Sequence, residues 1–173
     1  MHVPSYDALQ IGNEFLVSVW FHGESFLRNN PRIVSRKHVY TEDGGFEICL
    51  NNTGALDIRG GSSTCTALIL LPNYSNNWIQ VSFAFVDEMV TCYTNGSMAS
   101  SFEAGVIAAP TDNGLPLAFG NHSDGTGLAP SFYGQYDEIR LRGGSLSADR
   151  IKADYDMIAN RSFLGYGDVK NVK

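Results

Sequence analysis

Alternating apolar and polar residues, interrupted by turn residues about every 8–12 positions, constrain this chain more than any other feature. The longest alternating run covers residues 78–86. Its apolar side chains share one face of a strand and are Ile79, Val81, Phe83 and Phe85. Only one helical pattern occurs, late in the chain. This order favours an antiparallel β-sandwich over a parallel sheet with alternating helices.

Two further features of this pattern predict how the strands are arranged. Residues 15–21 carry apolar side chains on both faces, which is typical of a strand in the centre of a sheet. Asn95-Gly96 is a strong hairpin signal, because a type I′ turn needs two residues that tolerate positive φ. The two tryptophans, Trp20 and Trp78, lie in strand patterns, and we expect both in the core.

A strand over residues 132–142 contains a carboxylate in an unusual place. Asp137 has the same parity as Ile139 and Leu141, so simple alternation places it on the buried face. A buried carboxylate is costly unless its charge is compensated. We therefore expect a partner for Asp137, which could be a metal ion, an arginine or several backbone N–H groups.

A short helix should follow this strand. Gly143-Gly144 interrupts the strand, and Ser147 stands at the position of a helix N-cap. A stripe of apolar side chains recurs at helical spacing, at Ile151, Tyr155 and Ile158. The pattern predicts a helix of about three turns.

The motif Phe-x-Gly-x-x-Asp-Glu-Ile-Arg at residues 132–140, followed by Leu146-Ser147-Ala148, resembles the closing segment of laminin-G-like jelly-roll domains. These domains belong to the concanavalin A-like lectin/glucanase superfamily. Residues 15–20, 33–46 and 78–96 resemble earlier strands of that family in the same order. The resemblance implies an all-β fold, an antiparallel β-sandwich of the concanavalin A-like kind with one short C-terminal helix. It also implies a single domain over residues 1–173, excised from a longer secreted or surface protein.

The same resemblance implies a metal ligand. In sugar-binding relatives an aspartate on the last long strand often binds a structural calcium ion, and Asp137 resembles that position. Calcium takes six to eight oxygen ligands, so carbonyl groups and water would supply most of them. The alternative is an Asp137 held by backbone N–H groups or by an arginine such as Arg36.

The acidic residues argue against catalysis. Superfamily members that hydrolyse β-glucans carry Glu-x-Asp-x-x-Glu on one strand face, and this chain has no such array. Its acidic pairs, such as Asp137-Glu138, are adjacent, so in a strand they point to opposite faces. With catalysis disfavoured in this way, the resemblance implies a non-catalytic recognition module that binds carbohydrate. The alternative is a protein-interaction or spacer module without a sugar site, and a glycoside hydrolase is the third possibility.

Exposed aromatic side chains are the candidates for sugar contacts. Tyr40, Tyr74 and Tyr133 lie at loops or strand ends, whereas His22 and His38 are expected at the surface or in loops. The net charge of −6 argues against nucleic acid and anionic membranes as partners. No apolar run is long enough for a membrane span. The resemblance places the protein outside the cell or on its surface, although these residues contain no signal peptide.

Overall fold

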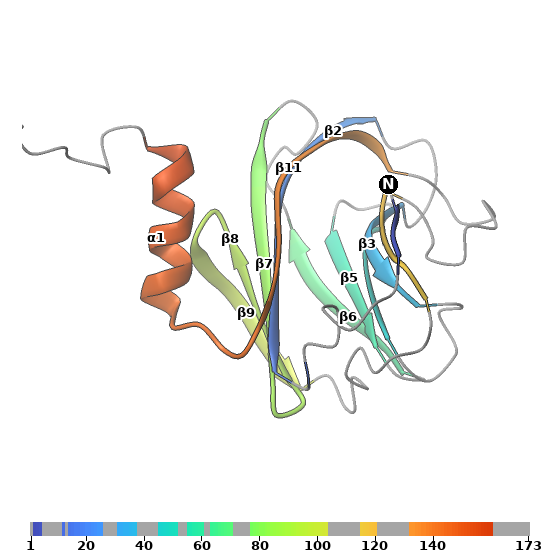
Figure 1. Ribbon diagram of the computed structural model, residues 1–173, viewed down its shortest axis with the longest axis horizontal. Coiled ribbons are helices and arrows are strands. Elements are labelled where there is room, and N and C mark those ends of the chain that lie inside the picture. The colour runs from blue at the N-terminus through green and yellow to red at the C-terminus, as the bar shows by residue number, and fades with distance from the viewer. Residues whose placement is uncertain are drawn as a thin grey trace, which may run out of the picture.

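A computed structural model describes residues 2–4, 12, 14–25, 31–37, 45–51, 55–60, 63–70, 77–103, 115–120 and 132–160. These residues form a six-stranded and a five-stranded antiparallel sheet that face each other, with one helix against the outer side of the five-stranded sheet (Figure 1). This arrangement confirms the predicted all-β sandwich with a short C-terminal helix. Within the described residues no helix is long and apolar enough to cross a membrane.

The six-stranded sheet has the strand order β1-β10-β3-β4-β5-β6. Its strands are β1 (His2–Val3), β3 (Arg32–Arg36), β4 (Phe46–Leu50), β5 (Ala55–Gly60), β6 (Ser63–Leu70) and β10 (Leu117–Phe119). The two-residue strand β1, which pairs with β10, is too short to show an alternating pattern and was not expected from the sequence. The sequence also predicts a strand over residues 163–172 that lies against the edge of the sandwich, and these residues lie outside the described part of the chain.

The five-stranded sheet has the order β11-β2-β7-β8-β9. Its strands are β2 (Phe15–Ser25), β7 (Ile79–Val86), β8 (Met89–Thr94), β9 (Ser97–Glu103) and β11 (Tyr133–Gly143). Strand β2 lies between β11 and β7, which confirms its predicted central position.

The main core fills the space between the sheets. From β2 it receives every second residue, Phe15, Val17, Val19 and Phe21. The Phe15 ring stacks on Phe85 of β7 with 4.2 Å between centroids. Each such fully buried side chain stabilises the fold by roughly 1.5–3 kcal/mol relative to exposure. The opposite, outer face of the five-stranded sheet therefore receives Leu16, Ser18, Trp20 and His22.

The hairpin between β8 and β9 turns as predicted. Asn95 has φ 51° and Gly96 has φ 73°, the two positive values that a type I′ turn requires. Asp87 and Glu88 also have positive φ, 47° and 65°, and form the turn between β7 and β8.

Helix α1 (Ala148–Ala159) covers part of the outer face of the five-stranded sheet (Figure 1). It begins as expected, because the Ser147 side chain accepts a hydrogen bond from the Arg150 backbone N–H at 3.3 Å. Ile151 packs into a second cluster with three residues of the sheet, Leu16, Ala84 and Tyr93. The covering helix explains why β7 is buried on both faces, including its polar residues Gln80 and Ser82.

The expectation that Asp137 is buried is wrong, because β11 contains a bulge. The pairing register shifts between Asp137 and Arg140, and Glu138 adopts a φ of 49°. This irregularity reverses the alternation, so Tyr136 and Ile139 both pack against the core although they are three residues apart. Asp137 is exposed, and its Oδ1 accepts a hydrogen bond from the Glu138 backbone N–H at 2.8 Å.

The expected core position of Trp78 is also wrong. Trp78 immediately precedes β7 and has the parity of Gln80 and Ser82, which face outward. It is 42% exposed, whereas Trp20 is only 8% exposed. Trp20 is buried as predicted, but beneath α1 rather than between the sheets: its ring stacks on Tyr155 of the helix.

Candidate functional site

Side chains from three neighbouring strands form a row on the outer face of the five-stranded sheet. His22 on β2 pairs with Gln135 on β11. Phe21 pairs with Ile79, so Trp78, one residue earlier, stands opposite His22 on the other side. Residues opposite each other in an antiparallel pair point to the same face. Tyr133 lies two residues before Gln135. The register shift beside it places the extra residue on β2, so Tyr133 keeps the orientation of Gln135. We call these four residues the outer platform.

The outer platform presents aromatic rings and an amide to solvent. Trp78 is 42% exposed and Tyr133 is 52% exposed. Gln135 is exposed, and His22 is half-buried. The centroids of the His22 and Trp78 rings are 5.8 Å apart, and the ring planes are inclined by 51°. Large exposed rings beside polar groups are typical of binding surfaces rather than of a folding core.

The outer platform lies beside the part of the sheet face on which α1 packs. Trp20, two residues before His22 on β2, lies under Tyr155 with ring centroids 5.4 Å apart and planes inclined by 7°. Lys152 of the same helix lies 5.5 Å from the centroid of the Tyr155 ring. The stack therefore fixes the boundary between the covered and the open part of this face.

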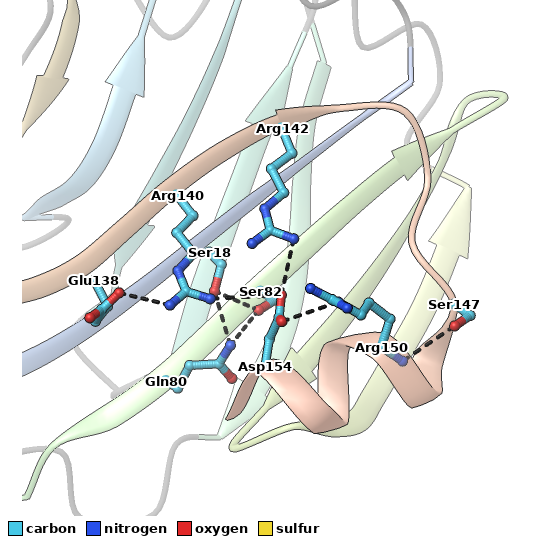
Figure 2. A network of polar contacts seen from close by, with 9 residues as sticks. All are labelled: Ser18, Gln80, Ser82, Glu138, Arg140, Arg142, Ser147, Arg150 and Asp154. Carbon is cyan, nitrogen blue, oxygen red and sulfur yellow. Dashed lines mark hydrogen bonds and ion pairs between the residues drawn. The ribbon is translucent and has the colours of Figure 1, made fainter. Parts of the chain in front are cut away.

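A buried polar network supports the strand that carries Trp78 (Figure 2). The Gln80 Nε2 group donates to the hydroxyl oxygens of Ser18, at 2.9 Å, and Ser82, at 2.6 Å. Gln80 Oε1 accepts from the backbone N–H of Gly96 at 3.2 Å. The backbone N–H of Gln80 donates to the Asn95 side chain at 3.0 Å. Two residues from Trp78, the start of β7 is thus bonded to both β2 and the β8–β9 turn.

Arginines from β11 and α1 are directed at the buried carboxylate of Asp154 (Figure 2). Arg142 and Arg150 each approach it to 3.2 Å, and Arg140 approaches it to 3.8 Å. Arg140 also bonds Glu138 at 2.8 Å. These contacts fasten α1 to β11, and they engage the cationic groups of this part of the sheet.

The predicted calcium ligand lies next to the platform. Asp137 pairs with Trp20 on β2, in the row adjacent to that of His22. The described residues contain no group of three or more His, Cys, Asp or Glu side chains that could hold a metal ion. Calcium at Asp137 would therefore depend on backbone carbonyl groups and water. The calcium assignment stays a prediction, without the burial that first motivated it.

The other expected residues are divided between the described and undescribed parts of the chain. The prediction that Tyr133 is exposed is confirmed, whereas Tyr40, Tyr74 and His38 lie outside the described residues. Trp78 and Gln135 were missed as site residues. The parity that Trp78 shares with Gln80 is the signal that could have placed it on the outer face.

The Cys92 thiol is unreactive. Cys49 and Cys92 are both buried. Burial raises the pKa of Cys92 from 9.0 to about 12, against a smaller opposing effect of its hydrogen bond with Ser100. Since the thiolate is the nucleophilic form, Cys92 is inert at neutral pH. The apolar or threonine-rich strand segments around these cysteines predict small buried hydrophobic residues, and the burial of Cys49 and Cys92 confirms this.

A family model described as the concanavalin A-like lectin/glucanases superfamily matches residues 1–152. No curated protein matches the chain. Several solved structures share its fold at low sequence identity, which supports the fold alone.

One similar structure is the binding domain of Paraclostridial Mosquitocidal Protein 1, with 14% identity and a TM-score of 0.69 over 92% of this chain and 41% of that one. Another is domain 4 of AbnA, a GH43 extracellular arabinanase from Geobacillus stearothermophilus, in complex with arabinotriose. It has 20% identity and a TM-score of 0.62 over 83% of this chain and 66% of that one. The third is the CBM40 of Ruminococcus gnavus IT-sialidase, with 13% identity and a TM-score of 0.69 over 86% and 85%. The chain thus spans less than half the length of the first.

Proposed function

The chain belongs to the concanavalin A-like lectin/glucanases superfamily, and we propose that it is a non-catalytic module that recognises carbohydrate through its outer platform. The observation that carries this proposal is the exposure of Trp78, at 42%, and Tyr133, at 52%, on one sheet face. The exposed amide of Gln135 lies on the same face.

The chemistry of the platform suits a sugar. The C–H faces of a sugar ring are apolar and pack on aromatic rings, while its hydroxyl groups need hydrogen-bond partners. Trp78 and Tyr133 supply rings, Gln135 supplies a donor and an acceptor, and the nearby Asp137 supplies acceptors. The half-buried His22 ring beside Trp78 restricts the motion of the indole and so reduces the entropy lost on binding.

The structural relatives give independent support. One of them, domain 4 of the GH43 arabinanase, was solved with arabinotriose bound. Another is a CBM40 of a sialidase. The arabinanase is described as extracellular, which supports a site of action outside the cell or at its surface for this chain as well.

A non-catalytic role is favoured by the state of the carboxylates near the platform. A retaining glycosidase needs two carboxyl groups about 5–5.5 Å apart that face one substrate. Asp137 and Glu138 are instead adjacent in a bulge. Asp137 accepts a backbone hydrogen bond, and Glu138 forms an ion pair with Arg140.

The test is a glycan and polysaccharide panel probed with the protein displayed multivalently, because avidity reveals weak single sites. We expect binding to one sugar class that free sugar competes away. Trp78→Ala should lower the affinity for the sugar at least tenfold, whereas Met98→Ala should leave it unchanged. Met98 is a matched control, because it is a large apolar side chain, 65% exposed, on the edge strand β9.

Two outcomes would contradict the proposal. Sugar binding that survives Trp78→Ala would place the site elsewhere on the molecule. If the wild-type protein binds no glycan or polysaccharide of the panel, a protein-interaction module is favoured instead.

A further inference from the structure

We propose that the outer platform binds an internal stretch of a linear, uncharged oligosaccharide, rather than a single terminal sugar or an acidic one. This inference rests on the proposed function and adds the length and charge of the ligand. It follows from the separation of the two exposed rings, from the shape of the row and from the charges around it.

The separation of Trp78 and Tyr133 determines the length of the oligosaccharide that the platform can contact. Trp78 extends β7 and Tyr133 begins β11, with β2 between them, so they are two strand spacings apart, or about 10 Å. Tyr133 also lies two residues beyond the row of Gln135, which adds about 7 Å along the strand. The backbone positions of the two residues are therefore about 12 Å apart across the sheet. This exceeds the width of one sugar ring, so each aromatic side chain would stack on a different sugar of the same chain.

The shape of the row favours a chain that passes across the face. His22 is aligned with Gln135 by strand pairing, and its ring lies beside that of Trp78. Paired residues of neighbouring strands point to the same face of a sheet. His22 and Gln135 thus stand in one row between the two rings, where an intermediate sugar can bond to Gln135.

The charge around the platform favours a neutral ligand. Asp137 is exposed beside it, and the chain as a whole carries a net charge of −6. Among the described residues of β11 and α1, the cationic side chains are engaged by Asp154, Glu138 and Asp156. The groups concerned are Arg140, Arg142, Arg150 and Lys152. In calcium-free buffer, a carboxylated or sulfated sugar on the platform would meet the negative charge of Asp137, which these cations do not offset because they are engaged elsewhere.

The experiment measures affinity by titration calorimetry for three neutral series, xylo-, cello- and arabino-oligosaccharides of one to six units. Oligogalacturonides of the same lengths are the acidic series. We expect one neutral series to gain at least tenfold in affinity from one unit to four. We expect the acidic series to bind at least fivefold more weakly than that neutral series at low salt, the size of a like-charge contact near the surface.

Two variants test the two parts of the inference. Tyr133→Ala should remove the gain from chain length and leave the short oligosaccharides nearly unaffected. Asp137→Asn should raise the ratio of the affinity for oligogalacturonides to the affinity for the neutral series at least threefold. Asp149→Asn is the matched control, because Asp149 is an exposed carboxylate in the first turn of α1, which contributes no residue to the outer platform.

The outcomes separate this inference from the proposed function. If Trp78→Ala abolishes binding but neither chain length nor Tyr133→Ala matters, the platform binds sugar and the linear-chain inference is overturned. Equal or tighter binding of the acidic series would overturn the charge argument. If no series binds at any length, the inference also fails. If Trp78→Ala leaves sugar binding intact, both proposals fail. Thermal melting of each variant confirms that these exposed substitutions leave the fold unchanged.

Discussion

Replacing Gly96 with alanine tests how tightly α1 packs on the β8–β9 turn. A Cβ atom at Gly96 would lie 2.8 Å from Tyr155 Cβ and 2.9 Å from Lys152 Cδ. The lysine side chain can move aside, whereas Tyr155 Cβ can move only with the helix. The Gly96 backbone N–H also bonds to Gln80, so a shift of the turn would disturb the buried polar network.

The expected loss in the free energy of unfolding of Gly96→Ala has two parts. Gly96 has φ +73°, and an alanine in this left-handed conformation costs roughly 1–2 kcal/mol. Overpacking against a well-ordered neighbour costs a further 1–3 kcal/mol or so. We therefore expect Gly96→Ala to lower the free energy of unfolding by about 2–5 kcal/mol.

Gly144→Ala is the control, because it shares the strain but not the clash. Gly144 has φ +80°, and a Cβ atom there would meet nothing within 4 Å. This variant should lose only the strain component, about 1–2 kcal/mol. Thermal or urea denaturation measures both variants, with a shift of about 2–4 °C in midpoint per kcal/mol for a domain of this size. Equal destabilisation of the two variants would refute close packing of α1 on the turn.

Three further predictions concern charge, pH and metal. Asp154→Ala should cost about 1–3 kcal/mol by chemical denaturation, since its arginine partners are only partly shielded from water. The same change at Asp156, which pairs with exposed Lys152, should cost under about 0.5 kcal/mol, and equal losses would contradict the buried ion pair. The raised pKa of Cys92 means that the unfolded chain binds fewer protons than the folded one between pH 9 and about 12. The contribution of this thiol to the free energy of unfolding should therefore be fully present below pH 9 and be lost as the pH rises through this range. The free energy of unfolding should fall less in Cys92→Ala than in the wild type. An equal dependence on pH in the two proteins would contradict the assignment to Cys92. A calcium ion at Asp137 should stabilise the protein by about 2.7 kcal/mol at a hundredfold excess over its Kd, and the effect should vanish in EDTA and in Asp137→Asn. An unchanged melting midpoint would remove the site.

Most of the fold could be predicted because its determinants are local. Alternation over residues 79–86 and the Asn95-Gly96 pair specify strands and a turn without reference to distant residues. The start of α1 was equally local, since Ser147 caps the backbone N–H of Arg150 three residues later. Strand β1 could not be found, because two residues carry no periodicity.

The predictions of burial from the sequence were wrong where one extra residue shifts the strand register, or where two segments distant in the sequence pack together. The bulge at Asp137 and Glu138 inserts an irregularity that alternation cannot reveal, and it moved a carboxylate from the expected core to the surface. The burial of Gln80 and Ser82 depends on α1, about 70 residues further along the chain. Period-two reasoning assigns such residues to solvent, because it contains no information on what covers a sheet.

The same long-range dependence determines where the candidate site lies. Trp20 and Trp78 occupy the same outer face of one sheet, yet one is 8% exposed and the other 42%. The structural difference between them is that Tyr155 stacks on Trp20. Neither β2 nor β7 encodes this difference in its own sequence. The outer platform is thus defined by how far α1 extends over the sheet, and the contacts that dock the helix, through Asp154 and against Gly96, also determine which aromatic rings remain open for a ligand.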